Sequence, residues 1–144
     1  MTQPENTIRA MTDADYPQVV ALWRQTEGIG LSESDSPTAV SAYLQRNPGM
    51  SGIAVLPSGQ IVGAVLCGHD GRRGYLTHLA VAESHRRQGI GRALVEHAVA
   101  ALQREGIIGC NLFVWNANQT ARQFWESMGW QAPNDWGVMN RRFS

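Results

Sequence analysis

The chain has 144 residues, of which 43 % are apolar and five are tryptophan; this suffices for the core of a single domain over residues 1–144 and excludes an intrinsically disordered chain. Twelve Lys and Arg residues balance twelve Asp and Glu residues, so the overall charge favours neither a nucleic acid nor an anionic membrane as partner. The sequence shows no apolar run that would span a bilayer or form a signal peptide. Cys67 and Cys110 lie outside any CxxC pattern, so we expect both to be buried strand thiols in a reducing, cytoplasmic protein.

The first half of the chain predicts one strand and two helices. Residues 7–11 are apolar enough for a strand. Residues 12–26 predict a helix with Asp15 as its cap, Pro17 in its first turn and an inward apolar face. Residues 34–49 predict a second helix, capped by Ser36 and ended by Asn47-Pro48-Gly49.

The rest of the chain alternates strands with helices. Two β runs joined by Ser58-Gly59 indicate a hairpin. A strand over 75–81 and a loop over 82–88 then lead into a helix over 89–105, and an apolar strand over 107–115, covered on both faces, follows. A last helix runs from Asn118 to Gly129, and 136–143 predicts a final strand. The order β-α-α-β-β-β-α-β-α-β indicates an α/β or α+β fold with helices on both faces of a mixed sheet.

The stretch ESHRRQGIGRAL, residues 83–94, has the chemistry of an anion site. It places two arginines and two glycines directly before an apolar helix. The first N–H groups of a helix lack internal partners and the helix dipole is positive there. Glycines allow close approach of a ligand to the backbone, and arginines add charge-assisted hydrogen bonds. A phosphate or pyrophosphate fits this description.

Charge is unevenly distributed along the chain. The stretch 72–92 carries five arginines and one acid, Glu83, whereas the first 36 residues carry six acids and two arginines. This predicts a basic pole that would hold an anionic ligand and an acidic pole elsewhere; the alternative is compositional scatter on a solvated surface. The five arginines are Arg72, Arg73, Arg86, Arg87 and Arg92.

Two familiar phosphate loops fit this stretch poorly. A Walker loop requires a lysine, and the chain contains none. A dinucleotide fingerprint requires a third small residue three positions after Gly91, where Leu94 stands.

The loop and its surroundings resemble the GCN5-related N-acetyltransferase (GNAT) family. Arg86-Arg87-Gln88-Gly89-Ile90-Gly91 matches the family's Q/R-x-x-G-x-G/A signature, Leu79-Ala80-Val81 matches the strand before it, and GRALVEHAV matches the helix after it. NANQTARQFWESMGW, residues 116–130, resembles the second motif, in which an Asn precedes an aromatic pair. The resemblance covers nearly the whole chain, and it implies a mostly antiparallel mixed sheet flanked by helices.

The resemblance implies acetyl-CoA as co-substrate. The backbone N–H groups of residues 87–92 would hold the diphosphate. Leu79 and Val81 would offer backbone groups to the pantetheine arm, lying as an added strand between 75–81 and 107–115, and Asn118 would bond the same arm. The alternatives are core packing for the two apolar residues and helix capping for Asn118. The implied set is Leu79, Ala80, Val81, Arg86, Arg87, Gln88, Gly89, Ile90, Gly91, Arg92 and Asn118.

Two positions depart from the family pattern of proton handling. Trp125 stands where a Tyr proton donor is frequent, and an indole N–H is not a useful acid. Phe113 stands where the fifth strand often carries a Glu base. The remaining candidate base is His78, because an imidazole side chain can accept a proton from an amine directly or through water; the alternative for it is a partly buried strand histidine. Tyr75 is a substitute acid without specific support, and no metal site is expected from the spacing of His, Cys and carboxylates.

Two functions follow as hypotheses. The first is an N-acetyltransferase that passes the acetyl group of acetyl-CoA directly to a primary amine of a small molecule or a peptide N-terminus. The second is a non-catalytic acyl-CoA-binding sensor, motivated by Trp125 and Phe113. The acidic residues Glu27, Glu33 and Asp35 hint at a cationic acceptor, and an exposed final strand with the C-terminal tryptophans favours a homodimer.

Overall fold

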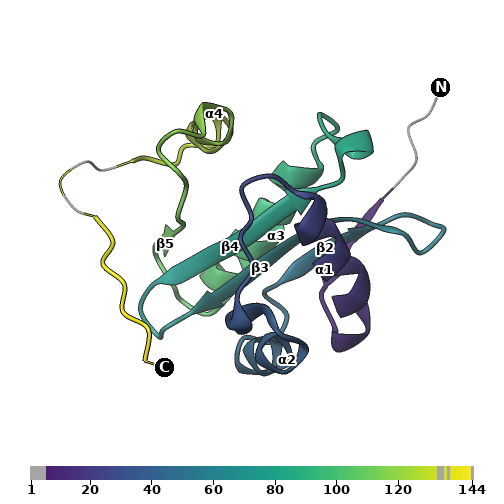
Figure 1. The fold of residues 1–144 in the computed structure, drawn as a ribbon, viewed down its shortest axis with the longest axis horizontal. Coiled ribbons are helices and arrows are strands. Elements are labelled where there is room, and N and C mark those ends of the chain that lie inside the picture. The colour runs from purple at the N-terminus through teal and green to yellow at the C-terminus, as the bar shows by residue number, and fades with distance from the viewer. Residues whose placement is uncertain (1–5, 133–134, 136, 144) are drawn as a thin grey trace. The chain divides into compact units, whose positions relative to one another are not determined.

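The computed structural model describes residues 6–132, 135 and 137–143. The chain forms two compact units, Met1–Phe113 and Val114–Ser144, and each is described by itself. The first unit holds a five-stranded sheet in the order β1-β2-β3-β4-β5, antiparallel except for the parallel pair β4–β5 (Figure 1). Its strands are β1 (Thr7–Ala10), β2 (Gly52–Val55), β3 (Ile61–His69), β4 (Gly74–Val81) and β5 (Cys110–Asn111).

Among the described residues of the first unit, three α-helices and three short 3-10 helices accompany the sheet. The α-helices are α1 (Tyr16–Gln25), α2 (Pro37–Arg46) and α3 (Ile90–Arg104). The 3-10 helices are η1 (Asp13–Asp15), η2 (Glu33–Asp35) and η3 (Glu83–His85). The second unit contains α4 (Gln119–Ser127). This element order and the mixed, mostly antiparallel sheet confirm the fold class expected from the sequence.

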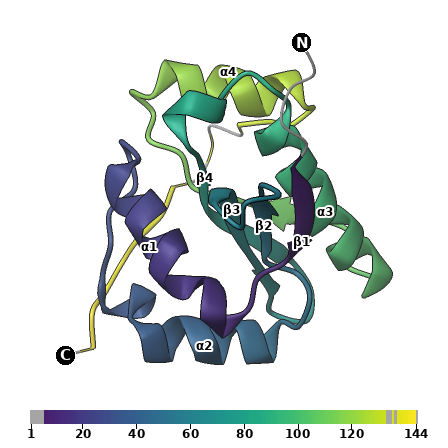
Figure 2. The same cartoon turned by 90° about the vertical axis from the view of Figure 1, so that its right-hand side faces the viewer.

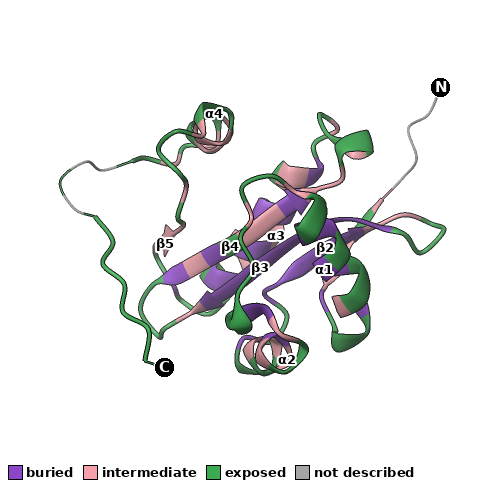
Figure 3. Ribbon diagram, in the orientation of Figure 1, coloured by how far each residue is buried: buried purple, intermediate pink, exposed green. Residues whose placement is uncertain are grey.

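The helices of the first unit cover both faces of the sheet. In Figure 2, α1 and α2 lie on one side of the sheet and α3 lies on the other. The central strand β3 is buried along eight of its nine residues, because each of its faces meets a helix layer (Figure 3). Val19, Val20, Leu22 and Trp23 of α1 are all buried, as the apolar spacing of that helix predicts.

Close packing against glycines seats α3 on the sheet. A Cβ added at Gly63 of β3 would lie 2.9 Å from side-chain carbons of Ile90 and Leu94, and one at Gly74 of β4 would lie 2.5 Å from Leu102. Larger residues at these two sites would therefore push the helix away from the sheet. This packing fixes the N-terminus of α3 next to the end of β4.

The helix caps match the prediction at α2 and differ at α1. The Ser36 hydroxyl accepts a hydrogen bond from Ala39 N at 3.1 Å, and Asn47 follows the last residue of α2. Asp15 does stand at the N-cap position of α1, but its side chain makes no capping hydrogen bond there. The cap interpretation of its carboxylate is therefore wrong.

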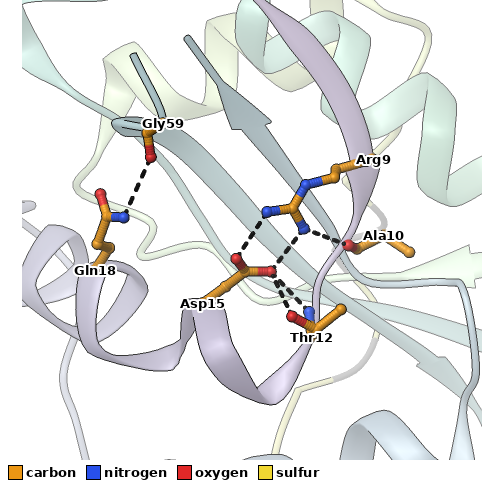
Figure 4. A network of polar contacts seen from close by, with 6 residues as sticks. All are labelled: Arg9, Ala10, Thr12, Asp15, Gln18 and Gly59. Carbon is orange, nitrogen blue, oxygen red and sulfur yellow. Dashed lines mark hydrogen bonds and ion pairs between the residues drawn. The ribbon is translucent and has the colours of Figure 1, made fainter. Parts of the chain in front are cut away.

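The Asp15 carboxylate instead ties β1 to the start of α1 (Figure 4). Arg9 donates two hydrogen bonds of 2.9 Å to its two oxygens, and Thr12 N donates a third of 2.8 Å. Burial raises the pKa of Asp15, but the hydrogen bonds from Arg9 and Thr12 outweigh it and leave the pKa below its ordinary value. Nearby, Gln18 bonds Gly59 O and Ile61 N, which fastens α1 to the β2–β3 hairpin.

We expect Asp15→Ala to lower the free energy of unfolding by about 2 kcal/mol at pH 7, because it removes a buried carboxylate that accepts hydrogen bonds from Arg9 and Thr12. A carboxyl with a lowered folded-state pKa stabilises the fold above its unfolded pKa, and this contribution is lost as the pH falls through the folded value. Urea unfolding at pH 7 and in acid should therefore show the deficit of Asp15→Ala shrinking in acid. Asp13→Ala, which removes an exposed carboxylate from the same turn, should change stability by less than about 0.5 kcal/mol; an equal loss in both variants would contradict the account.

The two cysteines are free thiols on two strands of the sheet, β3 and β5, which are separated by β4. Cys67 of β3 is fully buried, and burial raises its pKa to about 12. Cys110 of β5 is half-buried, and burial raises its pKa to about 11. The prediction of a buried strand thiol is confirmed for Cys67, whereas Cys110 lies in a strand but is only half-buried.

Two predicted strands differ from the structure. Of residues 107–115 only Cys110–Asn111 form a strand, and Ile108, Phe113 and Trp115 are exposed. The prediction of a long strand covered on both faces is wrong. β5 pairs with β4 over just two residues, and the rest of the apolar run lies outside the sheet. Trp136 lies outside the described residues, and residues 137–143 form no strand. Within the described residues, no helix is both long and apolar enough to cross a bilayer.

Candidate active site

Strand β4 separates from β5 after one short contact. Gly74 pairs with Cys110 and Tyr75 with Asn111, and these are the two register pairs of the parallel ladder. On its other side β4 remains paired with β3 as far as Val81. Within the described residues, Thr77–Val81 therefore have no strand partner on the β5 side. The carbonyls of His78 and Val81 accept hydrogen bonds from Trp23 and Arg86, and the other backbone groups on this edge could pair with an extended ligand.

The loop after β4 runs directly into α3. Arg87 has φ +63° and Gly89 has φ +82°, both in the left-handed region. Backbone in such turns directs successive N–H groups to one side and forms an anion-binding concavity. Gly89 is the N-cap of α3 and supplies no side-chain cap, unlike Ser36 at α2, so the first N–H groups of α3 have no side-chain acceptor from that position.

The loop arginines differ in what they contact. Arg86 Nε donates a hydrogen bond of 3.0 Å to Val81 O, which closes the loop back onto the end of β4. Arg87 and Arg92 are exposed, and Gln88 is half-buried. A Cβ at Gly89 would meet no atom within 4 Å, so the space in front of this residue is open.

The five arginines do not form one basic pole. Arg72 and Arg73 lie in the β3–β4 turn, before β4 begins, whereas Arg86 and Arg87 follow its end. An eight-residue strand is roughly 26 Å long, so the two pairs lie at opposite ends of β4. The clustering in sequence is therefore not a clustering in space: Arg86, Arg87 and Arg92 lie at the N-terminus of α3, and Arg72 and Arg73 do not.

His78 lies at a β-bulge in the middle of β4. Ala64 pairs with Ala80 and Leu66 with Thr77, so the single residue Val65 faces both His78 and Leu79. His78 has φ +55°, a conformation that costs a non-glycine residue about 1–3 kcal/mol. Bulges redirect side chains and are frequent beside active sites.

Two residues outside the predicted set hold His78 in place. Its Nε2 lies 2.9 Å from Oδ1 of Asp35, and Trp23 Nε1 donates a hydrogen bond of 3.2 Å to its carbonyl. The Trp23 and His78 rings also meet edge to face at 5.0 Å. Sequence reasoning missed both roles: Asp35 is marked by the capping-box pattern Ser32-x-x-Asp35, which signals a helix start and nothing about a partner 43 residues away.

The remaining predicted residues are divided between the two units. Leu79, Ala80 and Val81 line the end of β4, and Ile90 and Gly91 begin α3, so these five lie with the loop in the first unit. Asn118 and Trp125 belong to the second unit. There the Asn118 side chain accepts a hydrogen bond from Ala121 N at 3.0 Å, which is the capping alternative for this residue. Trp125 packs edge to face against Phe124 and Trp130.

Two further histidines have ordinary hydrogen-bond partners. His69 Nδ1 accepts a hydrogen bond from Gly71 N, and His97 Nε2 lies 3.1 Å from Gly49 O. Within the described residues no three His, Cys, Asp or Glu side chains group in a way that could hold a metal ion.

Comparison with known proteins identifies the class to which this arrangement belongs. The model of the acetyltransferase (GNAT) family matches residues 16–130. An acetyltransferase of Sodalis glossinidius is 24 % identical over 135 residues, covering 94 % of each chain. The chain therefore belongs to the GNAT family, and acyl transfer is the class of reaction that this membership supports.

Solved structures show the same fold. PaiA N-acetyltransferase from Thermoplasma acidophilum, in complex with coenzyme A, superposes with a TM-score of 0.78 at 17 % identity, covering 92 % of this chain and 94 % of that one. The ribosomal-protein-S18-alanine N-acetyltransferase from Escherichia coli has a TM-score of 0.70 at 23 % identity, covering 87 % of this chain and 77 % of that one. Both agree with a mixed sheet flanked by helices.

Proposed function

We propose that this protein is an acetyl-CoA-dependent N-acetyltransferase that transfers the acetyl group directly to a primary amine. The observation that carries the proposal is the split between β4 and β5, flanked at its end by the left-handed turn and uncapped N-terminus of α3. An elongated ligand with a diphosphate at one end would suit both features. Its extended arm would pair with the open edge of β4, and its diphosphate would bind at the N-terminus of α3.

In this proposal each part of the loop has a role. The N–H groups of residues 87–92 bind the diphosphate, and Gly89 and Gly91 let it approach the backbone. The open edge of β4 near Leu79, Ala80 and Val81 bonds the pantetheine arm, and the backbone near Val81 polarises the thioester carbonyl. Asn118, a helix cap in the structure, keeps its proposed contact with the same arm.

The chemistry requires an amine that loses a proton as it attacks. Its nitrogen forms a bond to the thioester carbon, the carbon–sulfur bond breaks, and the thiolate leaves with the electron pair. His78 is the proposed base. Much of the rate comes from holding the two reactants together, since a thioester is already reactive.

Turnover on a defined amine panel tests this function. The panel is 1,4-diaminobutane, tyramine and a hexapeptide with an N-terminal alanine. The diamine represents the cationic acceptor suggested by three acidic residues, of which Glu27 and Glu33 are exposed, whereas Asp35 is buried against His78. Release of the CoA thiol, with mass spectrometry of the acetylated amine, measures transfer. We expect acetyl-CoA binding and acetylation of at least one member; absence of acetyl-CoA binding would overturn the proposal.

The second candidate, a non-catalytic acyl-CoA sensor, is favoured by one observation. Trp125 is packed between two aromatic rings, and its indole cannot protonate a leaving thiolate. Acetyl-CoA binding with no turnover on the panel would favour the sensor.

We keep the cytoplasm as the proposed location and a homodimer as the proposed assembly.

We expect Trp125→Tyr to raise kcat on an accepted amine, by roughly tenfold, because it restores a hydroxyl acid where the family frequently has one. Steady-state kinetics with acetyl-CoA and that amine measure the change. Trp130→Tyr, a matched substitution in the same aromatic group, should leave kcat within about twofold. A lower kcat in Trp125→Tyr would contradict an acid role at this position.

A further inference from the structure

Asp35 is a buried carboxylate with two specific hydrogen-bond partners. It is 8 % exposed, and its Oδ2 accepts a hydrogen bond from Ser32 N at 3.0 Å, the backbone half of a capping box around η2. Its Oδ1 lies 2.9 Å from Nε2 of His78. The carboxylate is thus held by the η2 turn and aimed at the bulge of β4.

His78 is constrained from three directions. The bulge sets its backbone, the Trp23 indole holds its carbonyl, and Asp35 holds one ring nitrogen. The Trp23 ring meets the imidazole edge to face, which restricts rotation of the ring. A side chain this constrained presents its second ring nitrogen in one direction.

The Asp35 contact decides which ring nitrogen carries the proton. An ionised carboxylate only accepts hydrogen bonds, so Nε2 must be the donor, and in the neutral ring Nδ1 then bears the lone pair. Within the described residues Nδ1 of His78 has no hydrogen-bond partner. The nitrogen able to take a proton is therefore the one that the protein leaves open.

We propose that Asp35 is the positioning residue of this site, holding His78 in the Nε2–H form so that Nδ1 accepts the proton of the attacking amine. This inference rests on the proposed N-acetyltransferase function. As the nitrogen–carbon bond forms and the carbon–sulfur bond breaks, the amine proton moves to Nδ1, and the resulting imidazolium lies against the Asp35 carboxylate. The proton then passes through solvent to the thiolate, so the products are the amide and free CoA.

The matched control is Asp15. It is 6 % exposed, stands at the same third position of a capping box around η1, and likewise accepts a hydrogen bond from the first residue of that box. It makes no contact with His78 and pairs with Arg9 instead. Asp15→Ala therefore removes an equivalent buried carboxylate without touching the base.

The experiment is long-range ¹H–¹⁵N NMR of the imidazole nitrogens in the full chain, combined with kinetics on the panel amine that turns over fastest. The His78 signals are assigned by comparison with His78→Asn. We expect wild type to show Nε2 protonated and Nδ1 unprotonated at neutral pH. In Asp35→Ala we expect a mixture of tautomers and a kcat roughly 10- to 100-fold lower, with an unchanged KM for acetyl-CoA.

Asp35→Asn has one oxygen for the two donors Ser32 N and Nε2–H, and its amide NH2 turned toward Nε2 favours the Nδ1–H form, so its kcat should stay as low as that of Asp35→Ala. Asp15→Ala should leave both tautomer and kcat as in wild type. The inference is overturned if Asp35→Ala keeps the wild-type tautomer or loses no more kcat than Asp15→Ala. If Asp35→Ala does not fold, the NMR tautomer of His78 in the wild-type protein tests the inference by itself. A wild-type ring protonated at Nδ1 instead of Nε2 overturns it. Absence of acetyl-CoA binding to wild type is the separate failure of the proposed function, and it removes this inference as well.

Discussion

His78→Asn should lower kcat for an accepted amine by about 10²- to 10⁴-fold while leaving acetyl-CoA affinity unchanged, because a positioned base contributes about that much to a proton transfer. Asn is the suitable replacement since it tolerates the left-handed backbone at φ +55° and cannot act as a base. Steady-state kinetics with calorimetric acetyl-CoA binding separate the two effects.

His97→Asn is the control for loss of a histidine as such. His97 lies on α3, on the far side of the sheet from α1 and α2, and its Nε2 contacts Gly49 O. Its replacement should change kcat by no more than about twofold. A wild-type kcat in His78→Asn would show that water or the amine itself handles the proton and that the strained bulge has another purpose.

The double variant Arg87→Glu/Gly89→Glu should weaken acetyl-CoA binding by at least about 100-fold. It reverses the charge of the exposed loop arginine and places a carboxylate where the diphosphate would approach. Two charge-assisted hydrogen bonds at about 1.5–3 kcal/mol each account for a loss of this size. The acetyl-CoA concentration that gives half the maximal rise in melting temperature measures the affinity.

The β3–β4 turn offers a matched control for this variant. Gly71 has φ +95° with open space around it, and its neighbour Arg72 is exposed, so Gly71→Glu/Arg72→Glu applies the same charge change and similar backbone strain at the other end of β4. We expect that variant to lose stability but to bind acetyl-CoA within about threefold of wild type. Equal weakening in both would mean that net charge, and not the loop, governs binding.

Sequence reasoning succeeded where local chemistry decides the structure. Ser36 with Pro37 sets the start of α2, the apolar spacing from Ile90 to Leu102 sets the buried face of α3, and Ser58-Gly59 sets the β2–β3 hairpin. In each case the signal and its consequence lie within one element or one turn.

It failed where the structure depends on partners outside the predicted element. Asp15 has the spacing of a cap, but Arg9 and Thr12 take its oxygens instead. The bulge at His78 leaves no mark in the apolar pattern of β4, and its contact with Asp35 depends on how α1 and η2 pack on the sheet. The strand expected over 107–115 is only two residues long in the structure. Its length is set by the two residues of β4 with which it pairs and not by its own apolar composition.

The most direct test of the central claim is calorimetric titration of wild-type protein with acetyl-CoA and, separately, with S-acetylpantetheine, which shares the thioester arm and lacks the nucleotide diphosphate. The account predicts one acetyl-CoA per chain with micromolar affinity, much weaker binding of S-acetylpantetheine, and loss of this difference in Arg87→Glu/Gly89→Glu. No heat with acetyl-CoA, or equal affinity for the two ligands, would contradict the assignment of the loop as a diphosphate site.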